Sequence, residues 1–254
     1  MTTTLDIQYY TLLLPPPYSY AYGLALTLTE DGVRVVLDWR YTDRDELTDE
    51  EIADEGFIAD DDFFWKGTLP AVWESALQAL LRDTQWVSET ATDDSALSAT
   101  LTRSSEVVAS GSPGNRQEWE YFLQELVQAI YEAAQRERPL QIAYRRVERD
   151  GAPVQVHWEA SFLHRHFALT RLVNGRKQEQ PLDWHRLRPL LRVWYVPDYD
   201  LEQATADLPH RAGEYVDPGD GLWYQLDKAV VNPGKTNALK TLRETIRHFE
   251  EAGW

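Results

Sequence analysis

Cysteine is absent from this chain of 254 residues, and no apolar run is long. Without a thiol the protein forms no disulfide and offers no thiolate nucleophile or metal ligand, which favours a reducing compartment. A transmembrane helix needs about 20 consecutive apolar residues, whereas Leu12–Leu14 is followed at once by three prolines. From these absences we expect a soluble, cytoplasmic protein that does not contact a membrane.

Basic residues are scarce as well: 25 Lys and Arg stand against 42 Asp and Glu, giving a net charge of −17. The deficit is concentrated in residues 1–114, which hold 21 acids and 6 bases, a balance of −15. Residues 136–192 hold 12 bases and 6 acids, a balance of +6. The protein is therefore charge-polarised, and its overall charge disfavours nucleic acid as a partner because phosphates are repelled at long range.

The chain also lacks an assembled catalytic motif. It contains no Gly-x-Ser-x-Gly nucleophile elbow and no pair of carboxylates in a recognisable catalytic context. Residues 229–236 (AVVNPGKT) fit a permissive phosphate-binding loop, but Pro233 removes a backbone donor and only eighteen residues follow Thr236. We interpret this stretch as the start of a helix whose N-cap is Thr236. The sequence thus favours a non-enzymatic protein with no catalytic residues and no cofactor.

A metal site is not expected either. His164 and His166 alternate along one predicted strand and His157 lies on its predicted neighbour, so three imidazoles could face one zinc ion. No cysteine and no nearby pair of acids joins them. We interpret them as the ordinary polar face of a half-solvated antiparallel sheet.

Aromatic residues, by contrast, are abundant, with 10 Trp and 13 Tyr. Buried rings remove large apolar areas from water, so we expect a folded protein with an aromatic-rich core. A helix is predicted over residues 116–136, with Asn115 as its cap and Glu118 completing a capping box. Its apolar stripe, at helical spacing, consists of Trp119, Phe122, Leu126 and Ile130.

The rest of the chain reads mainly as strands and turns. Strands are predicted over residues 18–28, 33–41, 86–92, 96–108, 140–149, 154–162, 166–172, 191–196 and 222–231, with a polar strand ending at Leu182. Helices are predicted from a Thr68 cap to Arg82, briefly within 183–191, and over 237–252, while 198–220 reads as irregular. These elements indicate an α+β fold of antiparallel sheets with a few amphipathic helices.

Two subdomains are expected, because Ser110–Gly114 has the composition of a linker. The first is an acidic α+β subdomain over residues 1–112. The second covers residues 115–254 and comprises the helix 116–136, an antiparallel sheet and the final helix 237–252.

The densest charge run is Asp43–Asp62, with eleven acids and Arg44 as its one base. No Gly stands at the sixth position from Asp43, so the run is not a calcium-binding loop. Thr48 and Glu51 predict a capping box for a short helix. Two interpretations remain open: a solvated acidic face, or a docking site for a basic partner. The candidate partner-binding residues are Asp43, Asp45, Glu46, Asp49, Glu50, Asp60, Asp61 and Asp62.

The basic span 136–192 provides a second candidate site. It combines arginines with aromatic residues, as surfaces that bind nucleic acids or anions do. The candidate ligand-binding residues are Arg145, Arg165, Arg186, Trp158 and Trp184. The alternative interpretation is a set of arginines scattered over an ordinary surface.

Residues 126–190 resemble the WYL domain. The resemblance rests on a helix ending VQAI (127–130), the segment PLQIAY (139–144), HFAL (166–169), NGR (174–176) and LDWHRL (182–187). His166, Phe167 and Ala168 stand where the family has Trp, Tyr and Leu. The resemblance implies a small SH3-like β-barrel of the kind that commonly acts as a ligand-sensing regulatory module in bacteria.

Our leading hypothesis is a non-enzymatic protein-binding or adaptor module with a charge-polarised surface, whose partner is a protein with a basic surface. The alternative is a regulatory sensor of an anionic ligand or oligonucleotide that binds at residues 136–192. The sequence leaves the oligomeric state open.

Overall fold

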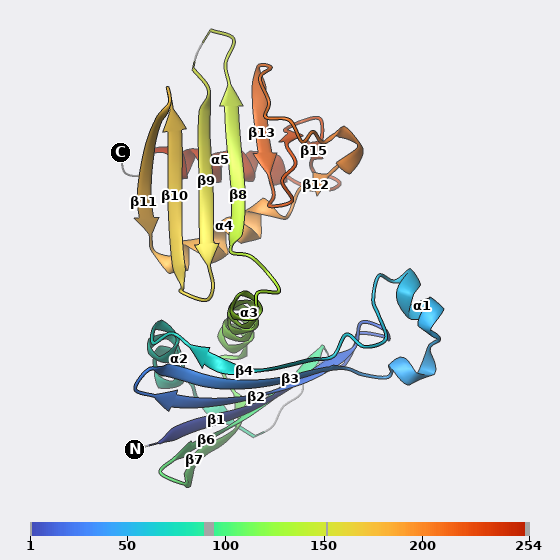
Figure 1. Cartoon of the computed structure of the whole chain (residues 1–254), viewed down its shortest axis with the longest axis vertical. Coiled ribbons are helices and arrows are strands. Elements are labelled where there is room, and N and C mark those ends of the chain that lie inside the picture. The colour runs from blue at the N-terminus through green and yellow to red at the C-terminus, as the bar shows by residue number, and fades with distance from the viewer. Residues whose placement is uncertain (1, 89–93, 151, 252–254) are drawn as a thin grey trace. The chain divides into compact units, whose positions relative to one another are not determined.

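The computed structural model describes residues 2–88, 94–150 and 152–251. The chain divides into two compact units, Met1–Glu137 (unit 1) and Arg138–Trp254 (unit 2). Each unit contains an antiparallel sheet and helices (Figure 1), so the α+β class is confirmed.

Unit 1 contains a seven-stranded sheet in the order β4-β3-β2-β1-β6-β7-β5. Its strands are β1 (Thr3–Thr11), β2 (Tyr20–Thr29), β3 (Gly32–Tyr41), β4 (Phe63–Leu69), β5 (Trp86–Val87), β6 (Ser95–Arg103) and β7 (Glu106–Pro113). Every paired neighbour is antiparallel. Side chains alternate between the two faces, so Leu5 and Ile7 of β1 are buried while Asp6 and Gln8 are exposed.

Helices α2 (Val72–Arg82) and α3 (Arg116–Ala133) pack on the buried side of this sheet (Figure 1). The ring of Phe122 in α3 meets Trp73 of α2 edge to face, at 5.6 Å between centroids. Trp119 packs against Trp86 at 5.6 Å and donates its indole N–H to Thr84 Oγ1 at 2.8 Å. The predicted apolar stripe is therefore core.

The aromatic-rich core continues on the same face of the sheet. The rings of Tyr9, Tyr22 and Trp39, on three adjacent strands, stack with successive centroids 4.9 Å apart. Tyr20 stacks on Trp39 at 4.3 Å, and burial raises the pKa of Tyr20 to about 12.

The boundary between the units corrects the one expected near Gly114, because α3 packs within unit 1. The segment expected to be a linker, Ser110–Gly114, lies in β7 as far as Pro113. Ser112 donates its hydroxyl to Leu97 O at 2.8 Å, and Gly114 donates its N–H to Gln85 O at 2.7 Å. These bonds tie the Gly- and Ser-rich segment into the sheet.

Unit 2 contains a six-stranded antiparallel sheet in the order β11-β10-β9-β8-β13-β14 and a two-stranded sheet of β12 and β15. Its strands are β8 (Leu140–Val147), β9 (Val154–Ser161), β10 (His166–Val173), β11 (Arg176–Leu182), β12 (Asp198–Tyr199), β13 (Gly213–Asp217), β14 (Tyr224–Gln225) and β15 (Val230–Val231). Helices α4 (Leu187–Trp194) and α5 (Ala238–Glu251) lie on one face of the larger sheet (Figure 1). Trp158 of β9 is buried there against Trp194, at 5.3 Å, and Phe249, at 5.8 Å.

Among the residues that the structure describes, three short 3₁₀ helices and one short α-helix complete the fold. They are η1 (Arg44–Glu46), α1 (Asp49–Asp54), η2 (Trp184–Arg186) and η3 (Leu201–Gln203).

Several predicted elements differ from the structure. The short helix expected within 183–191 is present as η2 and the start of α4, but α4 continues to Trp194 into the strand expected over 191–196, because Leu187, Leu190 and Trp194 are buried together at helical spacing. The strand expected over 96–108 is a hairpin of β6 and β7 that turns at Ser104 and Ser105, both with positive φ.

The predicted helix caps were partly wrong. Thr68 lies in β4, and α2 begins only at Val72. The side chain of Asn115 makes no capping bond to α3. Thr236 was expected to cap the last helix, but α5 begins at Ala238. Near its start the N–H of Leu239 donates to Asn232 Oδ1 at 2.8 Å.

Further strand predictions also differ. The strand expected over 222–231 consists of the short β14 and β15, and the segment expected to be irregular contains β13. Of the strand expected over 86–92, β5 covers Trp86–Val87, and residues 89–93 lie outside the described residues.

Candidate functional site

The acid run forms the connection between β3 and β4, and it carries η1 and α1. Trp39 of β3 pairs directly with Phe63 of β4. The N–H of Tyr41 donates to Asp62 Oδ1 at 2.9 Å, which joins the two ends of the connection. The segment therefore projects from one end of two paired strands (Figure 1).

Arg44 holds this segment in a folded arrangement. Its guanidinium carbon lies 3.7 Å from the ring centroid of Tyr41 and 4.7 Å from that of Phe57. Its Nε donates to Pro17 O at 3.1 Å and its Nη1 donates to Ile58 O at 2.9 Å. The Arg44 side chain is only 9% exposed. The one base of the run is thus an internal anchor and not a surface charge.

Four carboxylates of the run have structural partners: Glu51, Asp61, Asp62, and Glu55, which accepts the hydroxyl of Tyr18. Glu51 accepts the N–H and hydroxyl of Thr48 in the predicted capping box, and the backbone bond, followed by the hydroxyl bond, lowers the pKa of Glu51. Asp61 accepts the N–H of Ile58 at 2.8 Å and lies 3.6 Å from Arg44. Asp62 accepts the N–H of Tyr41 through its Oδ1 atom.

The remaining acids face solvent together with apolar side chains. Ile58 and Phe64 are each 65% exposed, and Leu12–Leu14 is exposed in the loop before β2. Tyr18 of that loop donates its hydroxyl to Glu55, so the loop and the acid run lie at the same end of unit 1. We call this surface the acidic end. Its exposed acids are Asp43, Asp45, Glu46, Asp49, Glu50, Glu51, Asp54, Glu55, Asp60 and Asp62, with Asp61 half-buried.

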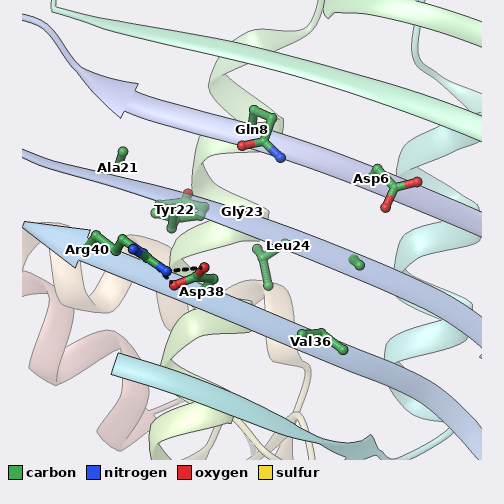
Figure 2. Close-up of a pocket in the computed structure, with 10 residues that line it drawn as sticks. Asp6, Gln8, Ala21, Tyr22, Gly23, Leu24, Val36, Asp38 and Arg40 are labelled. Atoms are coloured by element: carbon green, nitrogen blue, oxygen red, sulfur yellow. Dashed lines mark hydrogen bonds and ion pairs between the residues drawn. The ribbon is translucent and has the colours of Figure 1, made fainter. Parts of the chain in front are cut away.

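A groove of about 390 Å³ lies on the face of the unit 1 sheet opposite α2 and α3. Small side chains of β2 form its floor: Ala21 and Gly23, both labelled in Figure 2, and Ala25, which pairs with Val36. One wall comes from Asp6 and Gln8 of β1, and the other from Val36, Asp38 and Arg40 of β3. We call it the β2 groove.

Strand register explains the shape of the β2 groove. Gly23 pairs with Gln8 on one side and with Asp38 on the other. A side chain at position 23 would begin 3.3 Å from Gln8 Nε2, so glycine leaves the floor open.

The β2 groove leads toward the acidic end. Arg40 bonds Asp38 at 3.0 and 3.1 Å, and this bond, with a smaller contribution from Asp62, raises the pKa of Arg40. Arg40 pairs with Ala21 at the groove's end, and the next residue, Tyr41, is bonded to Asp62. The groove and the acidic end are consecutive parts of one surface.

The five candidate residues of unit 2 do not form one site. Arg145 is 6% exposed on the sheet face opposite α4 and α5, where its Nε donates to Pro209 O at 2.7 Å. Trp158 lies on the helix-covered face against Phe249, and Arg186 lies over the same Phe249 ring at 4.5 Å. The remaining two residues form a separate pair, with Arg165 lying 5.2 Å from the ring of Trp184.

The three histidines considered for zinc are dispersed. His164 lies in the turn after β9, His166 pairs with Ser161, and His157 pairs with Thr170. Among residues 2–88, 94–150 and 152–251, no group of three His, Asp or Glu side chains is placed to hold a metal ion.

Sequence reasoning missed the β2 groove and the role of Arg44. The sequence signal for the groove is the alternation of the small residues Ala21, Gly23 and Ala25 with the large residues Tyr22 and Leu24. It places the small residues together on one face of the strand. The signal for Arg44 was its place as the one base among eleven acids.

Comparisons with known proteins identify no family to which the chain is similar. No family model matches the chain, and no curated protein and no solved structure matches it. The resemblance to the WYL domain stays a prediction. Within the described part of the chain, no helix is long and apolar enough to cross a membrane.

Proposed function

We propose that unit 1 binds a partner protein through a segment that is basic and partly apolar. The observation that carries this proposal is the acidic end, a segment anchored by Arg44 that presents exposed carboxylates together with the exposed Ile58, next to the exposed Phe64 at the start of β4. Solubility alone needs a net charge of only about 2–8 in a small domain, and it needs no fixed arrangement of the charges.

Charge and apolar contact have different roles in this proposal. Exposed charge pairs contribute only about 0–1 kcal/mol each, so the acids act mainly by accelerating association with an oppositely charged surface. Burial of Ile58 and Phe64, each 65% exposed in the free protein, would supply affinity in the complex.

The β2 groove fits a lysine or arginine side chain of the same partner. The aliphatic stem would lie over Gly23 and its alanine neighbours, as long basic side chains do on apolar surfaces. Asp38 is already paired with Arg40, but Asp6 has no bonded partner within the described residues. Asp6 is therefore the carboxylate available to the incoming cation.

An anionic ligand at residues 136–192 has weaker support. The guanidinium groups of Arg145, Arg165 and Arg186 are each engaged within unit 2, by a carbonyl oxygen or an aromatic ring. Contacts of this kind are typical of arginines that are packed into a fold, and they give little support to an anion-binding role.

Selection from a random peptide display library on the intact protein tests the proposal. We expect enriched peptides to combine Lys or Arg with large apolar residues. Their association rates should fall as salt shortens the screening length from about 10 Å at 0.1 M to about 3 Å at 1 M. Enrichment of acidic or uncharged peptides would contradict the proposal.

Charge-matched variants locate the binding surface. One variant neutralises Asp45, Glu46, Glu50 and Asp60, which are exposed and make no structural bond among the described residues. Asp61 and Asp62 are left intact because they hold the backbone. The control neutralises Glu30, Asp31, Asp83 and Glu106, which are exposed outside the acidic end. We expect the first variant to slow association several-fold and the control to slow it much less; equal effects would leave the acidic end without a specific role.

A further variant, Gly23→Val, fills the β2 groove without a change of charge. Valine suits a strand, and the exposed side chain of Gln8 can move away from the new Cβ, so we expect weaker peptide binding with little change in the melting temperature.

A further inference from the structure

Unit 2 contains a separate groove of about 340 Å³ on the sheet face opposite α4 and α5. We call it the His157 groove. Its side chains form three successive rows across the strands: Gln141 with Glu159, His157 with Thr170, and Leu172 with Lys177. Rows on one face of a strand lie about 6.6 Å apart, since each residue advances about 3.3 Å. The volume lies within the range of small-molecule sites.

Two buried side chains, Arg145 and Gln155, determine which nitrogen of His157 accepts a hydrogen bond. Arg145 and Gln155 are 6% and 8% exposed, and Arg145 Nη1 donates to Gln155 Oε1 at 3.0 Å. A guanidinium group can only donate, so Gln155 directs its amide oxygen to Arg145 and its NH₂ group to His157. Gln155 Nε2 lies 2.7 Å from His157 Nε2, which must therefore be the acceptor.

The proton of the neutral His157 ring is consequently on Nδ1. Burial lowers the pKa of His157; Lys177 lowers it further and Asp217 opposes the shift. Nδ1 has no bonded partner in the part of the chain that the structure describes. Together with the hydroxyl of Thr170, it gives the middle row two uncharged donors.

One outer row carries a carboxylate, and the other carries a lysine whose charge is compensated by an ion pair. Glu159 accepts the amide of Gln141 at 3.2 Å, which fixes a carboxylate at one end of the groove. Lys177 pairs with Glu179 at 3.1 Å, beside the exposed Leu172, at the other end. A ligand in the groove can present a cation to Glu159, a hydrogen-bond acceptor to the middle row and an apolar part to Leu172.

We propose that the His157 groove binds a small zwitterion of the amino-acid class with an aliphatic side chain. Its carboxylate accepts hydrogen bonds from His157 Nδ1 and the Thr170 hydroxyl, and its ammonium group pairs with Glu159. Its side chain packs on Leu172. The spacing of about 6.6 Å between the first two rows accommodates a hydrogen bond of about 2.9 Å to each end of such a molecule. This proposal is independent of the function proposed for unit 1.

Calorimetric titration of the whole protein with three probes tests the ligand class. The probes are L-leucine, 4-methylpentanoate, which lacks the ammonium group, and 3-methylbutylamine, which lacks the carboxylate. Because hydrogen bonds to charged groups contribute about 1.5–3 kcal/mol, each analogue should bind at least about tenfold more weakly than L-leucine. No saturable L-leucine binding, or 4-methylpentanoate binding equal to that of L-leucine, would overturn the proposal.

Substitutions separate the two ends of the ligand. Glu159→Gln should weaken L-leucine and leave 4-methylpentanoate unchanged, whereas Thr170→Val and His157→Phe should weaken both. Glu244→Gln, the same charge change on the exposed face of α5, is the control. Melting curves identify any variant that fails to fold, and the near-isosteric Thr170→Val keeps the test decisive if His157→Phe does so. L-leucine affinity unchanged in both Glu159→Gln and Thr170→Val would refute the assignment.

Discussion

Arg44 illustrates how a charge inside an acidic run can stabilise structure. Its guanidinium group donates to the carbonyls of Pro17 and Ile58 and packs on the ring of Tyr41, so its removal leaves both carbonyls without this donor, and that of Pro17 is partly buried. A hydrogen bond that involves a charged group contributes about 1.5–3 kcal/mol.

We predict that Arg44→Ala lowers the local stability of residues 43–62 by about 2 kcal/mol or more, because hydrogen bonds and cation–π contacts are lost together. Amide hydrogen exchange at Ile52 and Phe57, whose N–H groups donate to Thr48 O and Ile52 O, measures this stability. Arg44→Lys keeps the charge but not the planar fork, and its effect should be intermediate. Unchanged exchange in Arg44→Ala would mean that the segment folds without its anchor.

His157 gives a prediction about pH. Its folded pKa is lowered, first by burial, so below the unfolded value of about 6.5 the unfolded chain binds more protons than the folded one. The free energy of unfolding should therefore fall as pH drops from about 6.5 toward the folded pKa. His157→Gln should reduce this fall.

Melting curves of both proteins at closely spaced pH values provide the measurement for His157. Gln155, Lys177 and Asp217 face the same ring and are common to both proteins, so their own contributions largely cancel in the difference. Identical pH profiles would show that His157 titrates alike in both states.

Local signals in the sequence were sufficient for some of these residues. The capping box of Thr48 and Glu51 was predictable because both partners lie within one helical turn. The β2 groove was not predictable from the sequence. Gly23 forms the floor of the groove only because strand pairing places Gln8 and Asp38 on either side of it. The hydrogen bonds from Arg145 through Gln155 to His157 likewise join residues of β8 and β9 through side chains.

At the scale of elements, α3 contributes directly to the core of unit 1. Phe122 is 6% exposed and packs against Trp73. We predict that Phe122→Ala lowers the free energy of unfolding by about 3–5 kcal/mol, as large-to-small core substitutions do. Phe64→Ala is the matched control, because Phe64 is 65% exposed and its loss should cost less than about 1 kcal/mol. Denaturant unfolding gives both values, and similar losses would place Phe122 outside the core.

Elements were predicted well where the periodicity was long or the turn was explicit. Helix α3 has a long apolar stripe, and the hairpin of β10 and β11 turns at Asn174-Gly175, both with positive φ. The first part of helix α4 lies in the helix expected within 183–191, but its last residues were mistaken for a strand, because eight residues are too few for apolar spacing to distinguish the two. Strand β13 was missed because its place in the sheet depends on β8, which lies far away in the sequence.

At the scale of the whole molecule, each unit has its own sheet and its own buried aromatic residues. We predict that the segments Met1–Glu137 and Arg138–Trp254 fold when expressed separately, since each contains the partners of its own strands. Dispersed amide resonances and a cooperative melt of each segment are the expected results. A segment without cooperative unfolding would show that its core depends on the other.

The pairing of Trp39 with Phe63 has a consequence for how such a protein can be built and rebuilt. Paired residues on antiparallel strands have Cα atoms about 4.5–5.5 Å apart, so residues 42–62 leave the sheet and return beside their point of departure. A two-residue hairpin turn spans the same gap. We therefore expect that the segment can be removed from this hairpin, or transferred to a hairpin of another protein that supplies equivalents of Tyr41 and Pro17, without redesign of either sheet.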